Sequence, residues 1–272
     1  MFNNLRKSIT AKLSLSIIIL WIILALIFGF TDLEISIAVV DENSSWGIFG
    51  REFGEAPGWG LIAIALSTLI GSYEENIKKQ KISAYVISFI GIVIFALGAV
   101  RNSSYLMLIG GSMTISLVLF TLSSFKKDWS AYRELSAVII LLFIILPLLF
   151  VQLTKVFWGR VRFRDLLPGF IDYTPWFLPQ GITGNQSFPS GHTAMSFMLI
   201  PLLIPLRKMY FENHSKKLVA LILIFVVTSW ALFVAVSRVI VGAHYASDVL
   251  FSGGAACIIT LLLHHWLYVK RE

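Results

Sequence analysis

The chain has 272 residues, of which 57% are hydrophobic and 14% are charged, and its net charge is +7. A soluble domain of this size would carry about 25% charged residues, so the composition excludes a soluble protein and indicates several membrane spans. The basic residues cluster between apolar runs, where they orient membrane helices, so the charge does not indicate nucleic-acid binding. The single cysteine, Cys257, excludes a disulfide framework or a cysteine metal site within one chain.

The predicted elements are membrane-spanning helices, each of which needs about 20 predominantly apolar residues. The first apolar run follows a basic N-terminus but continues to about Phe30 without a small-residue cleavage site, which predicts a retained helix rather than a signal peptide. We therefore expect an all-α polytopic transmembrane helix bundle in a single integral membrane domain over residues 1–272. Its eight predicted helices lie at about 13–30, 57–72, 83–100, 104–122, 134–155, 191–206, 217–237 and 247–268.

The segment Thr31–Trp59, which follows the first predicted helix, mixes apolar residues with six acidic ones. This mixture predicts one or two interfacial helices that cover or flank a site at the membrane surface. A surface loop is the alternative.

Basic residues also predict the orientation of the chain. Fifteen of the 22 Lys and Arg residues fall at the two ends of the chain and in or beside the loops 73–82, 123–133 and 207–216. The positive-inside rule assigns these regions, and hence both termini, to the cytoplasm. Three polar stretches then share the opposite, extracytoplasmic side of the cell membrane: Lys155–Arg162, Pro189–His192 and Ser237–Asp248.

The stretch Ser237–Asp248 places His244 and Asp248 four residues apart. If the last helix begins near His244, the two side chains share one helix face. A carboxylate bonded to one imidazole nitrogen fixes the tautomer and leaves the other nitrogen as a nucleophile. Arg238 offers a fork of donors to phosphate oxygens. The alternative is structural: a His-Asp pair that caps a helix, and an arginine that reaches the lipid headgroups.

The stretch Pro189–His192 begins the sixth predicted helix. Ser190 can cap this helix, whose first backbone N–H groups attract anions. Gly191 lets the backbone approach a ligand closely. His192 lies on the first turn, where it could protonate a leaving oxygen. A helix start with an interfacial histidine is the structural alternative.

The stretch Lys155–Arg162 ends the fifth predicted helix with Lys155, Arg160 and Arg162. A phosphoryl-transfer transition state spreads negative charge over its oxygens, and fixed cations stabilise that charge. An anchor for anionic lipid headgroups is the alternative. We expect four nearby residues to support the site or to contact headgroups rather than to react: Arg160, Arg164, Asp165 and Asp172.

Taken together, Lys-x6-Arg, PSGH and Ser-Arg-x5-His-x3-Asp resemble the three-part signature of the type 2 phosphatidic acid phosphatase superfamily. The strings SFPSGHTA and SRVIVGAHYASDV strengthen the resemblance, which spans Lys155–Asp248. It implies a phosphatase that uses no metal or other cofactor, works through a phosphohistidine and has its catalytic core at about 134–268. His244 would be the nucleophile, Asp248 its orienting partner and His192 the general acid. The phosphate would be held by Lys155, Arg162, Ser190, Gly191 and Arg238.

Two features depart from the family's pattern. Phe163 stands where the family usually has proline after the arginine of the first motif. Proline stiffens the backbone but supplies no reacting group, so the change concerns the loop and not the chemistry. Membrane members of the family commonly have six helices, so the helices predicted at 83–122 would be an extra hairpin, which leaves the sidedness of later segments unchanged.

These observations predict an enzyme that removes phosphate from a lipid phosphate or diphosphate in the bilayer and that does not bind nucleic acid. A polyprenyl diphosphate carrier ranks first, because the used carrier appears on the outer face; phosphatidic acid, phosphatidylglycerol phosphate and isoprenoid diphosphates are the other candidates. A lipid phosphotransferase would use the same residues. A non-enzymatic headgroup binder or transporter would explain the cations but not the paired His244 and Asp248 beside a second histidine. The oligomeric state is left open by the sequence.

Overall fold

The structure is a computed structural model that describes the backbone of residues 2–269 and the side-chain surroundings of residues 11–267. Within the described part of the chain every regular element is helical. Eight helical segments among the described residues are long and apolar enough to cross a membrane, which confirms the predicted all-helical fold. The chain is therefore a multi-pass membrane protein. The eight segments are Ala11–Val39, Ser45–Gly71, Lys79–Val100, Ser104–Ser124, Trp129–Asp165, Gly191–Glu212, His214–Ile240 and Ala246–Leu267.

The chain folds into two compact units. The first unit combines Met1–Gly54 with Ile144–Glu272 and contains all three motif stretches, whereas the second unit is Glu55–Phe143. The main helices of the second unit are α3 (Ala56–Gly71), α4 (Ile82–Val100), α5 (Ser104–Ser124) and α6 (Arg133–Phe143).

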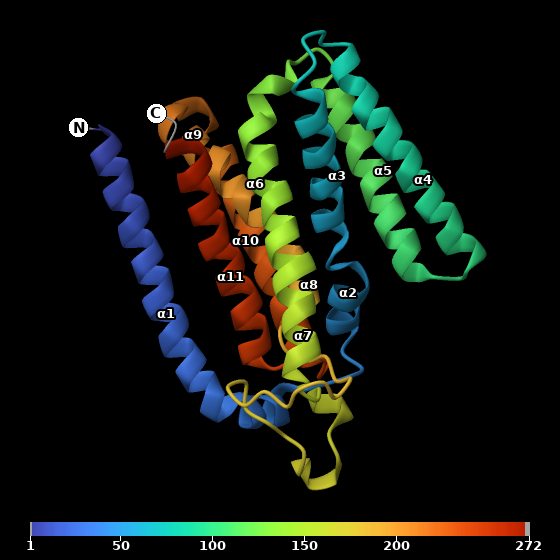
Figure 1. Cartoon of the computed structure of the whole chain (residues 1–272), viewed down its shortest axis with the longest axis vertical. Coiled ribbons are helices and arrows are strands. Elements are labelled where there is room, and N and C mark those ends of the chain that lie inside the picture. Colours follow the sequence, from blue (N-terminus) through green and yellow to red (C-terminus); the bar gives the residue numbers. More distant parts are fainter. Residues whose placement is uncertain (1, 270–272) are drawn as a thin grey trace. The chain divides into compact units, whose positions relative to one another are not determined.

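Helices α4 and α5 of the second unit form an antiparallel hairpin (Figure 1). Small residues let the two backbones approach closely: a Cβ atom added to Gly110 would lie 2.4 Å from the backbone oxygen of Gly91. The Ser103 hydroxyl caps α5 by accepting a hydrogen bond from the backbone N–H of Leu106. This hairpin occupies the region predicted as an addition to the family's six helices.

The first unit carries the motifs at one end of its helices. Figure 1 shows the end of α7, the start of α8 and the α10–α11 connection together at that end, beside the long connection between α7 and α8. The elements concerned are α1 (Phe2–Val39), α2 (Ser45–Phe53), the π-helical turn Ile144–Val151, α7 (Gln152–Trp158), α8 (Gly191–Ser196), α9 (Leu203–Glu212), α10 (Lys217–Ile240) and α11 (Ala246–His264).

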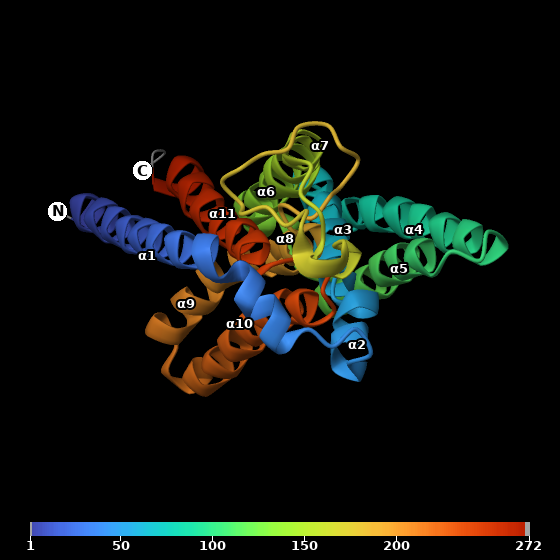
Figure 2. The ribbon, with the colours of Figure 1, turned by 90° about the horizontal axis from the view of Figure 1, so that it is seen from below.

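Helix α1 is longer than the sequence suggested. It continues past Phe30 to Val39 and lies along α11 (Figure 2), with the Trp21 ring 5.3 Å from that of Phe251. Asp32 and Ser36, which are polar residues of this extension, are fully buried. The extension therefore brings an acidic side chain into the interior of the unit.

The segment after the first predicted helix was expected to form either one or two interfacial helices or a surface loop. Its residues 45–53 are helical and form α2. Its glycines pack directly on α10: a Cβ atom added to Gly50 would lie 2.2 Å from the hydroxyl oxygen of Ser237. The backbone N–H of Asp41 also donates to the carbonyl of Ile240. The segment before α2 and α2 itself are thus fixed to the end of α10, where the third motif stretch, Ser237–Asp248, begins.

Candidate active site

Backbone hydrogen bonds join the three motif stretches. The N–H of Ser187 donates to the carbonyl of Arg160 over 3.0 Å, and the N–H of Ser190 donates to the carbonyl of Asp248 over 3.2 Å. The N–H of Arg164 donates to the carbonyl of Gly242, whose φ of +64° favours glycine. Segments that are 27 to 78 residues apart in the sequence thus form one interlocked set of loops.

His244 lies just before α11 rather than within it, because α11 begins at Ala246. Its Nδ1 atom lies 2.6 Å from the carbonyl oxygen of Ser187 and 3.5 Å from Oδ2 of Asp248. A carbonyl can only accept, so Nδ1 carries the hydrogen and Nε2 carries the free lone pair. The proximity predicted for His244 and Asp248 is present, but the predicted shared helix face is wrong: the turn before the helix brings them together.

Burial controls the protonation of His244, which is 3% exposed and lies outside the membrane-spanning segments. Burial lowers its pKa to about 4, and Lys155 and Arg238 act in the same direction. Asp248 opposes this shift through its hydrogen bond and its charge. At neutral pH the imidazole is therefore uncharged, which is the form that can act as a nucleophile.

Asp248 is fully buried at the third position of α11. Its Oδ2 atom accepts hydrogen bonds from the hydroxyl of Ser187 at 2.5 Å and from the backbone N–H of Tyr245 at 2.9 Å. Its Oδ1 atom faces Nη1 of Arg160 at 2.6 Å. Both oxygens thus have hydrogen-bond partners, which hold the carboxylate beside the imidazole.

His192 lies on the first turn of α8. Ser190 caps this helix as predicted: its hydroxyl accepts from the backbone N–H of Thr193 at 3.3 Å. Arg238, His244 and Lys155 are close enough for their charges to act on the His192 imidazole, which also hydrogen-bonds the backbone of Arg51 in α2. The imidazoles of His192 and His244 are therefore both exposed to the positive charges of Lys155 and Arg238.

Lys155 and Arg238 are the cations that surround these imidazoles. The Lys155 Nζ atom lies 3.8 Å from the position that a Cβ atom on Gly191 would take. Arg238 is buried, with 4% of its surface exposed, at the end of α10. Gly191, the two cations and both histidines together form a small positively charged centre at one end of the unit.

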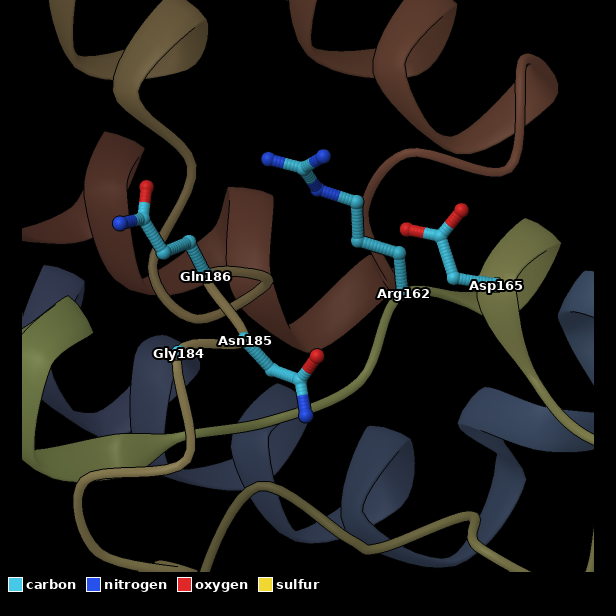
Figure 3. Close-up of a pocket in the computed structure, with 5 residues that line it drawn as sticks. All are labelled: Arg162, Asp165, Gly184, Asn185 and Gln186. Carbon is cyan, nitrogen blue, oxygen red and sulfur yellow. The ribbon is translucent and has the colours of Figure 1, made fainter.

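Arg162 lies in a different setting from the other two cations. It lines a polar pocket of about 290 Å³ with Asp165, Gly184, Asn185 and Gln186 (Figure 3). Among the described residues, the buried Nε atom of Arg162 has no hydrogen-bond partner. Figure 3 shows the Arg162 and Gln186 side chains extending in the same direction from two different loop segments. Since Gln186 directly precedes Ser187, the pocket adjoins the segment that contacts His244.

Phe163, which replaces the usual proline, is held by aromatic contacts. Its ring stacks on Phe170 with a centroid distance of 5.6 Å and meets Tyr245 edge-on at 6.5 Å. Such pairs stabilise a loop beyond the area that they bury. Packing thus takes over the stiffening that proline would supply.

Sequence reasoning missed three residues of the site: Ser187, Asp32 and Ser247. Ser187 belongs to the quoted string SFPSGHTA, so its position pointed toward the site although its role did not. Asp32 and Ser247 hydrogen-bond each other through both the backbone N–H and the hydroxyl of the serine. No spacing pattern could reveal this contact, because 215 residues separate the two. Within the described residues no group of three or more His, Cys, Asp or Glu side chains could hold a metal ion.

Comparison with known proteins agrees with the motifs. No curated protein and no solved structure matches the chain. The sequence model of the PAP2 superfamily matches residues 136–272, which is half of the chain and includes all three motif stretches. The match begins at the end of the second unit and leaves α1 and α2 outside it. The chain belongs to the PAP2 superfamily.

Proposed function

We propose that the protein is an integral membrane phosphatase that hydrolyses a lipid phosphate or diphosphate through a phosphohistidine. The observation that carries the proposal is the state of His244. Its Nδ1 atom donates a hydrogen bond to the carbonyl of Ser187 and lies beside the carboxylate of Asp248. This leaves Nε2 with a free lone pair in a buried site near Lys155 and Arg238. Membership of the PAP2 superfamily, whose members are generally phosphatases, supports the same chemistry.

In the proposed first step, Nε2 of His244 attacks phosphorus and the bond from phosphorus to the leaving oxygen breaks. His192 donates its proton to that oxygen as the bond breaks. Asp248 stabilises the positive charge that the ring gains on phosphorylation. In the second step His192, now neutral, takes a proton from water, which attacks phosphorus and releases phosphate and free His244.

Fixed cations supply the electrostatic part of the proposed mechanism. Lys155 and Arg238 act on both imidazoles and are suited to bind the equatorial phosphate oxygens. Arg162, which lines the adjacent pocket, would bind a phosphate oxygen through its unpartnered Nε–H group. Backbone groups at Ser190 and Gly191 would complete the binding of the phosphate.

The proposed location is the extracytoplasmic face of the cell membrane, with both termini in the cytoplasm. The distribution of Lys and Arg between loops supports this orientation. A polyprenyl diphosphate is the best-supported substrate, because the used carrier appears on that face; phosphatidic acid and phosphatidylglycerol phosphate are the alternatives. The catalytic core would be about 134–268 within a single membrane domain.

The test is phosphate release by the purified protein in detergent with EDTA present. Wild type is compared with His244→Ala, and with His214→Ala as a matched control, since His214 is exposed in the short turn between α9 and α10. The panel contains polyprenyl diphosphate, phosphatidic acid and phosphatidylglycerol phosphate.

We expect release that survives EDTA, persists in His214→Ala and disappears in His244→Ala. The ranking of rates across the panel then identifies the substrate class. Release that needs an added alcohol acceptor would identify a phosphotransferase. If no lipid releases phosphate and both histidine variants bind lipid as wild type does, the hydrolase proposal is wrong and a headgroup binder is favoured.

A further inference from the structure

Arg160 forms a buried ion pair with two carboxylates. Its Nη1 atom lies 2.6 Å from Oδ1 of Asp248, and its Nη2 atom lies 2.9 Å from Oδ2 of Asp32. Arg160 is 1% exposed and both aspartates are 0% exposed. One guanidinium thus joins an acidic residue near the end of α1 to the residue that supports His244.

Arg160 donates two further hydrogen bonds. Its Nε atom donates to the carbonyl of Thr174 at 2.8 Å, and Nη1 also donates to the hydroxyl of Ser247 at 2.9 Å. The Cζ atom of its guanidinium lies 3.9 Å from the centroid of the Tyr245 ring. Such a site fixes the planar fork of arginine and would not accept lysine equally well.

The charges in this cluster do not cancel. Asp32 and Asp248 carry two negative charges, and Arg160 carries one positive charge, so one negative charge remains beside His244. Without Asp32, the positive charge of Arg160 would be balanced by Asp248 alone, and the pair would present almost no net charge to the imidazole. A buried charge acts strongly on its neighbours because little water screens it.

On the basis of the proposed function, we propose that Asp32 and Arg160 are positioning residues: Asp32 balances Arg160, so that Asp248 keeps its negative charge for His244. Arg160 in turn fixes the rotamer of Asp248 through the Oδ1 contact, which leaves Oδ2 directed at the histidine. Asp32 belongs to α1, which lies outside the part of the chain that matches the family. In this proposal, a helix from outside the matched region therefore contributes to the active site.

A purely structural role is the competing explanation. Asp32 accepts hydrogen bonds from the backbone N–H and the hydroxyl of Ser247 on the first turn of α11, and so it anchors α1 to α11. That role predicts a loss of stability in variants of Asp32 or Arg160. It does not predict that the two variants shift the titration of His244 in opposite directions.

In the part of the chain that the structure describes, four ionisable groups face His244, each from a different helix. They are Asp248 from α11, Lys155 from α7, Arg238 from α10 and His192 from α8. None of them changes in the variants below, so a shift in the pKa of His244 reports the Asp32–Arg160 pair.

The experiment is a histidine NMR titration of the full-length protein in detergent, with the His244 signal assigned by its absence in His244→Ala. It compares Asp32→Asn, Arg160→Gln and the double variant with wild type. Glu34→Gln is the matched control, because it removes an exposed acidic charge from the same helix two residues away. The acid limb of kcat/KM against pH is recorded alongside.

We expect Arg160→Gln to raise the pKa of His244 by about half a unit or more, because a nearby positive charge is lost. Asp32→Asn lowers it by a similar amount, and the double variant returns it close to the wild-type value. Glu34→Gln leaves it unchanged. Shifts in the same direction for both single variants, or no shift in either, would overturn the proposal.

Two further results keep the test decisive. The NMR titration needs no substrate, so it tests the positioning roles of Asp32 and Arg160 independently of phosphate release. Either proposal can therefore fail while the other succeeds. If Asp32→Asn does not yield a monodisperse protein, Asp32→Glu replaces it, because it keeps the charge and changes only the geometry. The proposal then predicts an unshifted His244 titration, at most about tenfold lower kcat, and no change in KM; a shifted titration would contradict it.

Discussion

Replacing Asp248 by asparagine should remove the stabilisation of the phosphorylated imidazole while changing the shape of the site very little. The carboxylate oxygen lies 3.5 Å from Nδ1 of His244. At an effective dielectric constant of about 20, two unit charges at that distance attract by about 5 kcal/mol. Since about 1.4 kcal/mol corresponds to a factor of ten in rate, Asp248→Asn should lower kcat by about a thousandfold.

The same substitution should also destabilise the protein. It removes one of the two carboxylates that face the buried guanidinium of Arg160, and breaking a buried ion pair typically costs about 3–5 kcal/mol. The rate is therefore measured only on protein that stays folded, with thermal unfolding followed by tryptophan fluorescence. Glu42→Gln, an exposed carboxylate between α1 and α2, is the control. A folded Asp248→Asn protein that keeps more than a tenth of the wild-type kcat would refute this reasoning.

Three other perturbations test separate parts of the account. His192→Ala should slow release from lipid phosphates by about 10²–10⁴-fold but slow release from p-nitrophenyl phosphate far less, because nitrophenolate needs no proton to leave; equal losses on both substrates would argue against a general acid. The pKa of His244 is lowered to about 4 by burial, so the neutral nucleophile persists as pH falls and kcat/KM should decline only below about pH 4; a decline centred near 6.5 would contradict the burial. Gly50→Val should lower the melting temperature, since its Cβ would lie 2.2 Å from the Ser237 hydroxyl oxygen and overpacking typically costs about 1–3 kcal/mol. Gly111→Ala, whose Cβ meets nothing closer than 3.5 Å, should not lower it.

The membrane spans could be predicted from the sequence because lipid imposes a simple rule: about 20 apolar residues for each crossing. All eight predicted stretches fall within or close to the observed helices. The end of α1 could not be predicted in this way. Asp32 was among the acidic residues that suggested an interfacial segment after Phe30, but it is buried because Arg160 and Ser247 satisfy its carboxylate.

The motifs likewise predicted which residues gather at the site but not how they are held. His-x3-Asp suggested a shared helix face, whereas His244 precedes the helix and Asp248 reaches back to the N–H of Tyr245. The carbonyl of Ser187, the closest partner of His244 Nδ1, is a backbone group and leaves no trace in residue type. The role of Arg160 depends on a partner 128 residues away, and only the fold brings the two together.

The central claim is that His244 becomes phosphorylated during turnover, and rapid-quench mass spectrometry tests it directly. Full-length protein is mixed with the lipid that releases phosphate fastest, quenched under alkaline conditions that preserve phosphohistidine, and digested. The account predicts a phosphoryl group on His244, none in His244→Ala, and a larger steady-state amount in His192→Ala with p-nitrophenyl phosphate, because water then lacks its base. Turnover that persists in His244→Ala, with no phosphoryl group on His244 of the wild type, would contradict the account.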